Sequence, residues 1–261
     1  MQKAIICGVY QFLGFQLCSY LLESGVEIVG FTPPAISIDH LEEKKMEIGR
    51  NANFNERKWN DFHQVVQLND SHLFIDLYSL NSERIIYSTV KKFLEEKAVQ
   101  SALENVSVTI LANITSLTSK EPAFWEQENF KDLNLKVIYL PTLYGPWQPH
   151  EFSFQQLLSN KEKEIQVNDA EYILDAIYIE DAVMEIIRQS KKIESASLVF
   201  RSNVSNHWKA CTELLEWNVQ LPRNHASIIS FEEMMEVIVT NKHSLRDNLD
   251  KQKKHYELFR I

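Results

Sequence analysis

Glycine is scarce in this chain. Only six of the 261 residues are glycine. Five of the six fall at predicted turns or strand ends: Gly8, Gly14, Gly25, Gly30 and Gly145. Glycine is the residue that best tolerates tight turns and the close approach of two backbones. These few positions therefore mark where the backbone needs that freedom.

Other absences exclude whole classes of protein. Three cysteines without a C-x-x-C pair suit a reducing compartment. No stretch approaches about 18 apolar residues, and the N-terminus has no signal-like segment, so we expect a cytoplasmic protein without a membrane partner. The net charge of −9 argues against nucleic acid. The eight histidines form no metal-like cluster, so no metal is predicted.

The first thirty residues predict a strand, a helix and a second strand. An apolar run at 4–7 ends at Gly8 and predicts a buried strand. Leucines then recur every four positions over 13–21, as in an amphipathic helix, and Gly25 ends it. Residues 26–31 supply the second strand. This is a βαβ unit of the dinucleotide-binding type.

Gly8 and Gly14, with Phe12-Leu13 before the latter, resemble the G-x-x-G-x-x-G opening of the extended short-chain dehydrogenase/reductase family, the NAD-dependent epimerases and dehydratases. The resemblance implies an α/β fold, a Rossmann-type doubly wound parallel sheet with a small C-terminal α/β substrate lobe. It places the dinucleotide-binding core over 1–145. Residues 146–261 then hold the lobe, the C-terminal helix and two segments that return to the core, at 175–183 and 197–202.

The resemblance also implies a cofactor site. Its residues would be Gly8, Gln11, Phe12, Leu13, Gly14, Thr32, Leu77 and Pro141. Gln11 replaces the family's middle glycine, and its side chain should obstruct a pyrophosphate at the helix N-terminus. Thr32 replaces the acidic residue that binds the adenosine ribose. We therefore predict that binding of NAD(P) is weakened or lost.

The family's catalytic tyrosine and lysine have no counterpart at the expected place. Tyr87 and Lys91 fit the Y-x-x-x-K pattern but precede the predicted fifth strand at 106–112, whereas the catalytic helix follows it. The segment from there to the next strand, at 136–141, is short and holds no tyrosine. The tyrosine is the family's acid–base group, so its loss removes the proton transfer. The remaining catalytic candidates are Thr115, Ser116 and Tyr144.

Resemblance returns beyond this gap. Residues 144–146 look like the family's Y-G-P turn, and 175–183 look like its R-D-F-I-Y-V-D-D-V segment. Leu174 stands where nucleotide-sugar enzymes of the family commonly have the arginine that meets the substrate's phosphates. A nucleotide sugar is therefore a doubtful substrate.

Several further elements are predicted, the last of them from its resemblance to the family's closing helix. The charged segment 39–46 predicts a solvated helix capped by Asp39, to which we assign no chemistry. We predict a third strand at 62–67, a helix over 82–103, a capped helix start at 230–235 and a closing helix over 244–256.

Three functions remain open. The first is a catalytically degenerate relative of the epimerases and dehydratases that binds a small molecule, a dinucleotide or a protein partner, or that has a regulatory role. The second is an active NAD(P)-dependent oxidoreductase or epimerase with unusual catalytic groups. The third is a structural interaction subunit. Four altered positions along one mechanism favour the first and third. Because the family's catalytic helix contributes to its dimer interface, we expect a monomer or an atypical homodimer.

Overall fold

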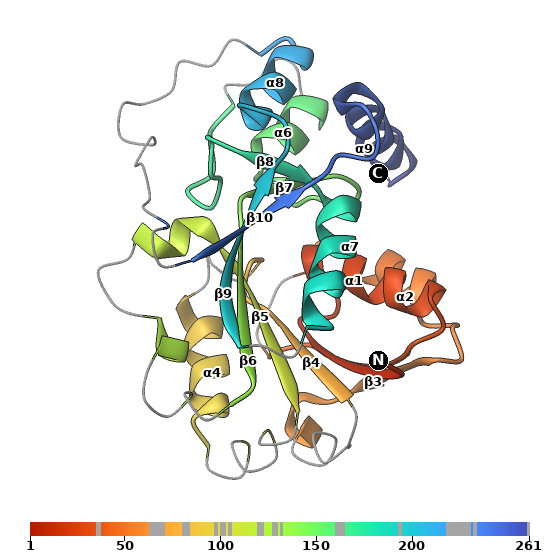
Figure 1. Cartoon of the computed structure of the whole chain (residues 1–261). Coiled ribbons are helices and arrows are strands. Elements are labelled where there is room, and N and C mark those ends of the chain that lie inside the picture. Colours follow the sequence, from red (N-terminus) through yellow and green to blue (C-terminus); the bar gives the residue numbers. More distant parts are fainter. Residues whose placement is uncertain are drawn as a thin grey trace. The chain divides into compact units, whose positions relative to one another are not determined.

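A computed structural model gives the fold of the chain (Figure 1). It describes residues 1–259 apart from 35–37, 63–70, 80–83, 97–98, 100–102, 104–105, 119–122, 127–129, 131–132, 160–164, 193–194, 218–230 and 232–233.

Eight strands form one sheet in the order β10-β9-β6-β5-β4-β1-β2-β3. Their bounds are β1 (Lys3–Cys7), β2 (Glu27–Phe31), β3 (Phe54–Arg57), β4 (Ser71–Asp76), β5 (Ser107–Asn113), β6 (Leu135–Leu140), β9 (Ala196–Ser202) and β10 (Met235–Val239). The pairs β1–β2, β1–β4, β2–β3, β4–β5 and β9–β10 are all parallel. The predicted Rossmann-type α/β fold is confirmed. A second, two-stranded sheet pairs β7 (Thr142–Tyr144) with β8 (Ala176–Tyr178).

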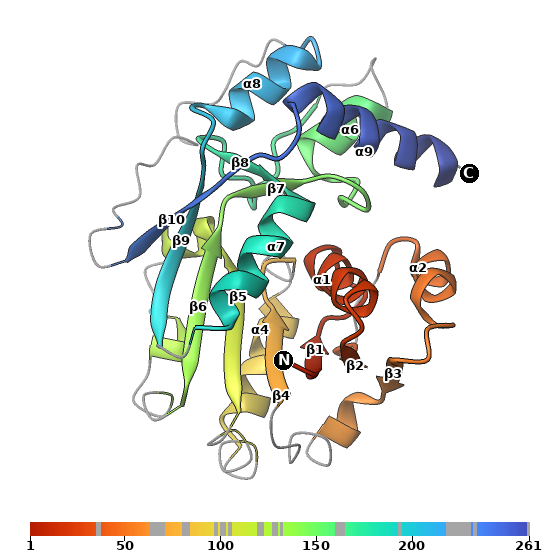
Figure 2. The same cartoon turned by 45° about the vertical axis from the view of Figure 1, so that its right-hand side comes forward.

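Within the described residues, the structure gives the helices α1 (Phe12–Glu23), α2 (Leu41–Ile48), α4 (Arg84–Leu94), α6 (Ser153–Ser159), α7 (Ile179–Ser190), α8 (His207–Leu214) and α9 (Leu245–Phe259). Short 3₁₀ helices there are η1 (Trp59–Asp61), η2 (Ile114–Thr118) and η3 (Phe124–Glu126). Figures 1 and 2 show α1 and α4 on opposite faces of the sheet. Right-handed crossovers require this, because β1–α1–β2 and β4–α4–β5 progress in opposite directions along the sheet.

The chain divides into two compact units. The first comprises residues 1–112, 119–138 and 186–197, and the second comprises 113–118, 139–185 and 198–261. In the first unit, every residue of β4 is buried, and so is every residue of β1 after Lys3, as in strands covered on both faces. The second unit contains the small sheet with α6, α8 and α9. The predicted boundary at residue 145 stays a prediction.

The predicted helix start at 230–235 is wrong where the structure describes it. Met235 begins the edge strand β10, whose side chains alternate between exposed and buried at its end. The run Val237-Ile238-Val239 favours a strand because β-branched side chains fit a pleated surface. The acidic residues before it, at 232 and 233, resembled the first turn of a helix, but they lie outside the described residues.

Three other local predictions need correction. The third strand is β3, and the predicted strand at 62–67 lies outside the described residues except for Phe62, which ends a 3₁₀ turn. Polar residues dominate β3, so apolar pattern did not reveal it. Helix α4 ends at Leu94 rather than near 103. Helix α2 is preceded by His40, in a left-handed conformation with φ of 54°, and not capped by Asp39.

Lys136 caps the end of α7. The side chain is buried, and its Nζ donates to the carbonyl oxygens of Gln189 at 2.6 Å and Lys192 at 2.7 Å. The last carbonyls of a helix carry partial negative charge and have no partner within the helix. The buried ammonium therefore gives a donor to one carbonyl in the last turn of α7 and to another two residues beyond its end.

We expect Lys136→Met to lower the free energy of unfolding by about 2 kcal/mol, because the apolar chain is kept while two carbonyls lose their donor. Urea denaturation measures the change. Lys191→Met, on an exposed neighbour, is the control and should differ from wild type by less than about 0.5 kcal/mol. Equal stabilities for the two variants would contradict a capping role.

In the part of the chain that the structure describes, no helix combines the length and apolar character that crossing a bilayer requires.

Candidate functional site

The carboxyl ends of β1 and β4 lie side by side in the centre of the large sheet. Cys7 pairs with Ile75 at the end of this ladder. The sheet continues through β5 on one side and through β2 on the other, so the order of strands reverses between β1 and β4. Open parallel sheets bind ligands at such switch points. The segments that follow β1 and β4 therefore form the candidate site.

Glycines build the turn from β1 to α1. Gly8 has φ of +90°, a conformation that other residues rarely adopt, and its N–H donates to Phe31 O at 2.8 Å. The N–H of Gln11 donates to Gly8 O at 2.9 Å, and α1 begins at Phe12. A Cβ on Gly14 would overlap Gly8 O. The first turn of α1 thus packs directly on the backbone of the glycine turn.

Two side chains from the end of β4 bond the first turn of α1. The Oδ2 of Asp76 accepts from Gly14 N–H at 2.8 Å, and the Oγ of Ser79 accepts from Leu13 N–H at 3.4 Å. Ser79 also donates to Asp76, from N–H to Oδ1 at 3.1 Å and from O–H to Oδ2 at 3.0 Å. Helix N-termini use such amides to bind phosphate. Here side chains of the protein occupy two of them.

Asp76 brings a negative charge to the same place. Its side chain is 1% exposed, and burial raises its pKa to about 6, although the hydrogen bonds from Ser79 and Gly14 favour the charged form. At neutral pH most of it is ionised. The positive end of the α1 dipole therefore already faces a carboxylate, which opposes a second anion there.

Lys44 is buried, although its helix was predicted to be solvated, and the assignment of no chemistry to this helix stays a prediction. The residue is 3% exposed, and its Nζ donates to Tyr10 O at 3.1 Å. Burial lowers its pKa to about 8, although the negative charges of Asp39 and Asp76 act to raise it. The sequence did not reveal this residue, because a lysine in a run of charged residues is usually exposed.

Two predicted cofactor residues carry buried atoms without a partner. Among the described residues, neither Gln11 Nε2 nor Thr32 Oγ1 has a hydrogen-bond partner. Buried polar atoms are nearly always bonded, to protein, water or ligand. Both atoms lie on segments that the resemblance assigned to a cofactor, one in the glycine turn and one directly after β2.

The remaining predicted cofactor residues are apolar. Phe12 and Leu13 are buried in α1, and Leu77 is buried after β4 with its N–H donating to Leu111 O at 2.9 Å. Pro141 is buried between β6 and β7. Their contacts with a cofactor stay a prediction.

Thr115 and Ser116 lie on η2, within the second unit. The side chain of Asn113 organises this turn: its Oδ1 accepts from Thr115 N–H at 2.9 Å, and its Nδ2 donates to Ala170 O at 2.5 Å. The Ser116 hydroxyl donates to Asn113 O at 2.6 Å. A hydroxyl bonded in this way to the backbone stabilises a turn, and a catalytic role for either residue stays a prediction.

Tyr144 lies in the core of the second unit. It is 0% exposed, its hydroxyl lies 3.1 Å from His207 Nε2, and His207 Nδ1 lies 2.7 Å from Ser202 Oγ. Burial raises the pKa of Tyr144 and lowers that of His207 to about 4. Both groups are therefore neutral at neutral pH. An acid–base catalyst must reach its substrate and have a pKa near the working pH, and Tyr144 has neither property in this structure.

The region between β5 and β6 holds η2 and η3, and among its described residues there is no α-helix. No tyrosine occurs in the sequence from 114 to 134. Tyr87 and Lys91 both lie on α4, before β5, and the side chain of Tyr87 lies outside the described part of the chain.

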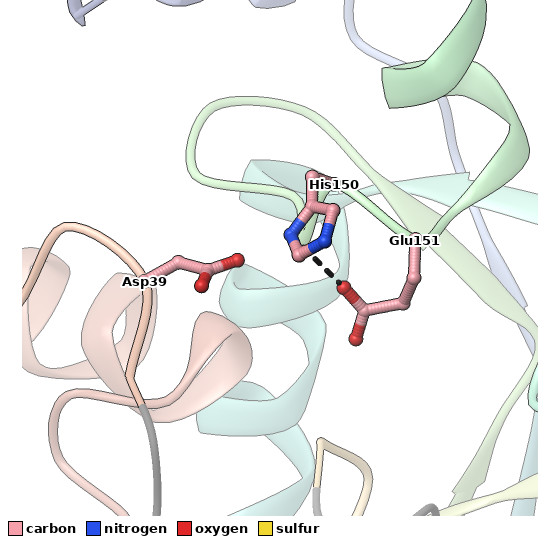
Figure 3. Close-up of side chains that lie close together, drawn as sticks. All are labelled: Asp39, His150 and Glu151. Atoms are coloured by element: carbon pink, nitrogen blue, oxygen red, sulfur yellow. Dashed lines mark ion pairs between the residues drawn. The ribbon is translucent and has the colours of Figure 1, made fainter.

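His150 and Glu151 follow β7 as a pair on the surface of the second unit. Their Nδ1 and Oε2 atoms lie 3.5 Å apart, as the dashed line in Figure 3 marks. The imidazole is 80% exposed, so this pair contributes little to stability.

No protein-family model and no curated protein sequence matches the chain. Solved structures do match over its whole length. The dTDP-glucose 4,6-dehydratase of Bacillus anthracis, solved with NAD, has a TM-score of 0.67 and 13% identity, over 100% of this chain and 98% of that chain. The UDP-glucose 4-epimerase of Thermotoga maritima, solved with UDP-glucose, has a TM-score of 0.64 and 13% identity, over 98% and 99%. The chain has the fold of the NAD-dependent epimerases and dehydratases.

A third structure of this epimerase/dehydratase fold is the enzyme WbmH of Bordetella bronchiseptica with NAD⁺. Its TM-score is 0.61 and its identity 14%, over 100% of both chains. At this level of identity the likeness concerns the fold alone. The likeness therefore assigns no function to this chain.

Proposed function

We propose that this protein is a catalytically degenerate relative of the NAD-dependent epimerases and dehydratases, which acts as a small-ligand-binding or regulatory protein. The observation that carries the proposal is the capping of α1 by Asp76 and Ser79. A pyrophosphate would have to displace both side chains from Leu13 and Gly14 and lie beside a buried carboxylate. Gln11 adds a side chain where the family has a glycine.

The catalytic positions support the same proposal. The family's proton transfer needs a tyrosine between the fifth and sixth strands, and the sequence holds none there. Tyr144 is buried and bonded to His207. Hydride transfer without a partner for the hydroxyl proton is incomplete.

A second candidate is an active oxidoreductase or epimerase that holds the dinucleotide in an unusual way. The unpartnered Gln11 Nε2 and Thr32 Oγ1 favour it, because a bound ligand would satisfy both. On this alternative, Gln11 is a ligand-binding residue rather than an obstruction.

Titration with NADH, followed by fluorescence of the five tryptophans, separates the two functions. We expect the wild-type protein to bind NADH with a Kd weaker than about 1 mM. The triple variant Gln11→Gly, Asp76→Asn, Ser79→Ala removes the Gln11 side chain, the charge of Asp76 and the Ser79 hydroxyl that accepts from Leu13 N–H. It should bind NADH at least about tenfold more tightly than the wild type. NADPH is titrated in parallel.

Ser24→Ala is the matched control, since Ser24 lies at the other end of α1 and its hydroxyl bonds Tyr20 O. Its NADH titration should match wild type. Micromolar binding by the wild-type chain would overturn the proposal, and so would a triple variant that folds but binds no better. If Gln11→Gly alone weakens binding, the second candidate is supported.

A further inference from the structure

The second unit contains a cavity of about 160 Å³ between α6, α8 and α9, which is partly open to solvent. Figures 1 and 2 show these three helices beside one another. Five leucines from the three helices and the end of α8 line it: Leu157, Leu158, Leu214, Leu215 and Leu249. An enclosed apolar cavity of roughly 150 Å³ can hold benzene. By volume, this partly open cavity therefore has room for one small aromatic or branched aliphatic group.

Charged residues complete the lining. Arg246, Asp250 and Lys253 lie at positions i, i+4 and i+7 of α9, on one face of the helix, and Glu216 follows α8. The charges sum to zero, with two of each sign. Within the described residues Arg246, Asp250 and Glu216 form no ion pair, and Lys253 reaches Glu257 only at 4.0 Å.

We propose that this cavity binds a free α-amino acid with an apolar side chain. The ligand's side chain would enter the leucine cavity. Its carboxylate would meet Arg246 or Lys253, and its ammonium group would meet Asp250 or Glu216. A zwitterion suits a lining that offers both charges close together, whereas an anion or a cation alone would leave one pair unmatched and face repulsion from it.

This amino acid site names a class of ligand for the small-ligand-binding function proposed above, and it rests on the proposed function only in that sense. All nine lining residues belong to the second unit and none belongs to the glycine turn. The two proposals therefore fail separately. Tight NADH binding would leave the amino acid site intact, and absence of the amino acid site would leave the weak NADH binding intact.

Isothermal titration calorimetry of the full chain with L-phenylalanine tests the site. We expect saturable binding within about 10 mM ligand, a range that detects millimolar affinity. 3-Phenylpropionate lacks the ammonium group and phenethylamine lacks the carboxylate, so each should bind about tenfold more weakly or worse. Binding of either analogue as tight as phenylalanine would overturn the zwitterion proposal.

Arg246→Gln and Asp250→Asn each remove one exposed charge and leave the leucines in place. Each should weaken phenylalanine binding about tenfold. Lys254→Gln, an exposed neighbour on the same helix that does not line the cavity, is the control and should bind like wild type. No heat of binding with the wild-type chain, or unchanged affinity in both charge variants, would refute the site.

Discussion

Replacing Gly14 with alanine is expected to lower the free energy of unfolding by about 3 kcal/mol or more. A Cβ there would overlap Gly8 O and lie 2.9 Å from the carbonyl carbon of Gly8. Both atoms belong to a backbone turn whose own N–H is bonded to Phe31 O, so the turn cannot yield as a flexible side chain would. The helix must therefore move away from β1, which also strains the bond from Gly14 N–H to Asp76.

Urea denaturation followed by circular dichroism measures this change. Ser19→Ala, in the same helix, is the control. The Ser19 hydroxyl is buried and has no partner among the described residues, so its removal should leave stability unchanged or raise it slightly. If Gly14→Ala is no less stable than Ser19→Ala, then the close packing of α1 on the glycine turn is not needed for the fold.

The large sheet was predictable because its central strands are short apolar runs bounded by glycine or polar residues. Residues 4–7 and 73–75 are such runs, and they lie in β1 and β4. Periodicity also revealed α1, and the resemblance to the family's closing helix indicated α9. Periodicity failed at β3 and β10, which lie at the two edges of the sheet. Edge strands keep polar or exposed side chains, so their sequences lack the apolar signal of a buried strand.

The altered cofactor positions were visible in the sequence, whereas what fills the site was not. Comparison with the family's motif is enough to show that Gln11 replaces a glycine. The bond from Asp76 to Gly14 joins residues 62 apart, and it depends on the parallel pairing of β1 with β4. One signal was available: Asp76 follows an apolar run, with Ser79 three residues on, and ligands of parallel sheets bind beyond the carboxyl ends of the strands.

Buried charges were the other feature that local pattern could not give. Lys44 sits in a run of charged residues, and Glu171 sits in a polar loop, yet both are almost fully buried. Charge in a sequence predicts exposure because few sites offer an ion enough partners. These two find backbone and hydroxyl partners in segments distant in sequence, Tyr10 for the lysine and Ser153 for the glutamate.

Glu171 should make the stability of the protein fall as pH rises. Its carboxylate accepts from Ser153 N–H, from the Ser153 hydroxyl at 2.5 Å and from Asn168 N–H at 3.0 Å, and so ties the preceding loop to the start of α6. Burial raises its pKa from 4.5 to about 7 despite these bonds. Because the folded pKa is raised, the folded state binds more protons than the unfolded state between the two values. The stability that protonated Glu171 contributes is fully present below the pKa of the unfolded state. It is lost as pH rises through the pKa of the folded state.

Glu171→Gln isolates this effect. The amide cannot ionise, and its NH₂ faces donors, so the variant should be about 1–3 kcal/mol less stable than wild type at about pH 5. Between about pH 5 and pH 8 the wild type should lose about 2–3 kcal/mol relative to the variant, so the gap narrows or reverses. Urea denaturation of both proteins at several pH values measures the difference between their free energies of unfolding. Asp76 is present in both proteins, so its titration cancels from this difference. Glu151→Gln, on an exposed glutamate, should follow wild type throughout. A constant gap between wild type and Glu171→Gln would show that Glu171 does not titrate in this range.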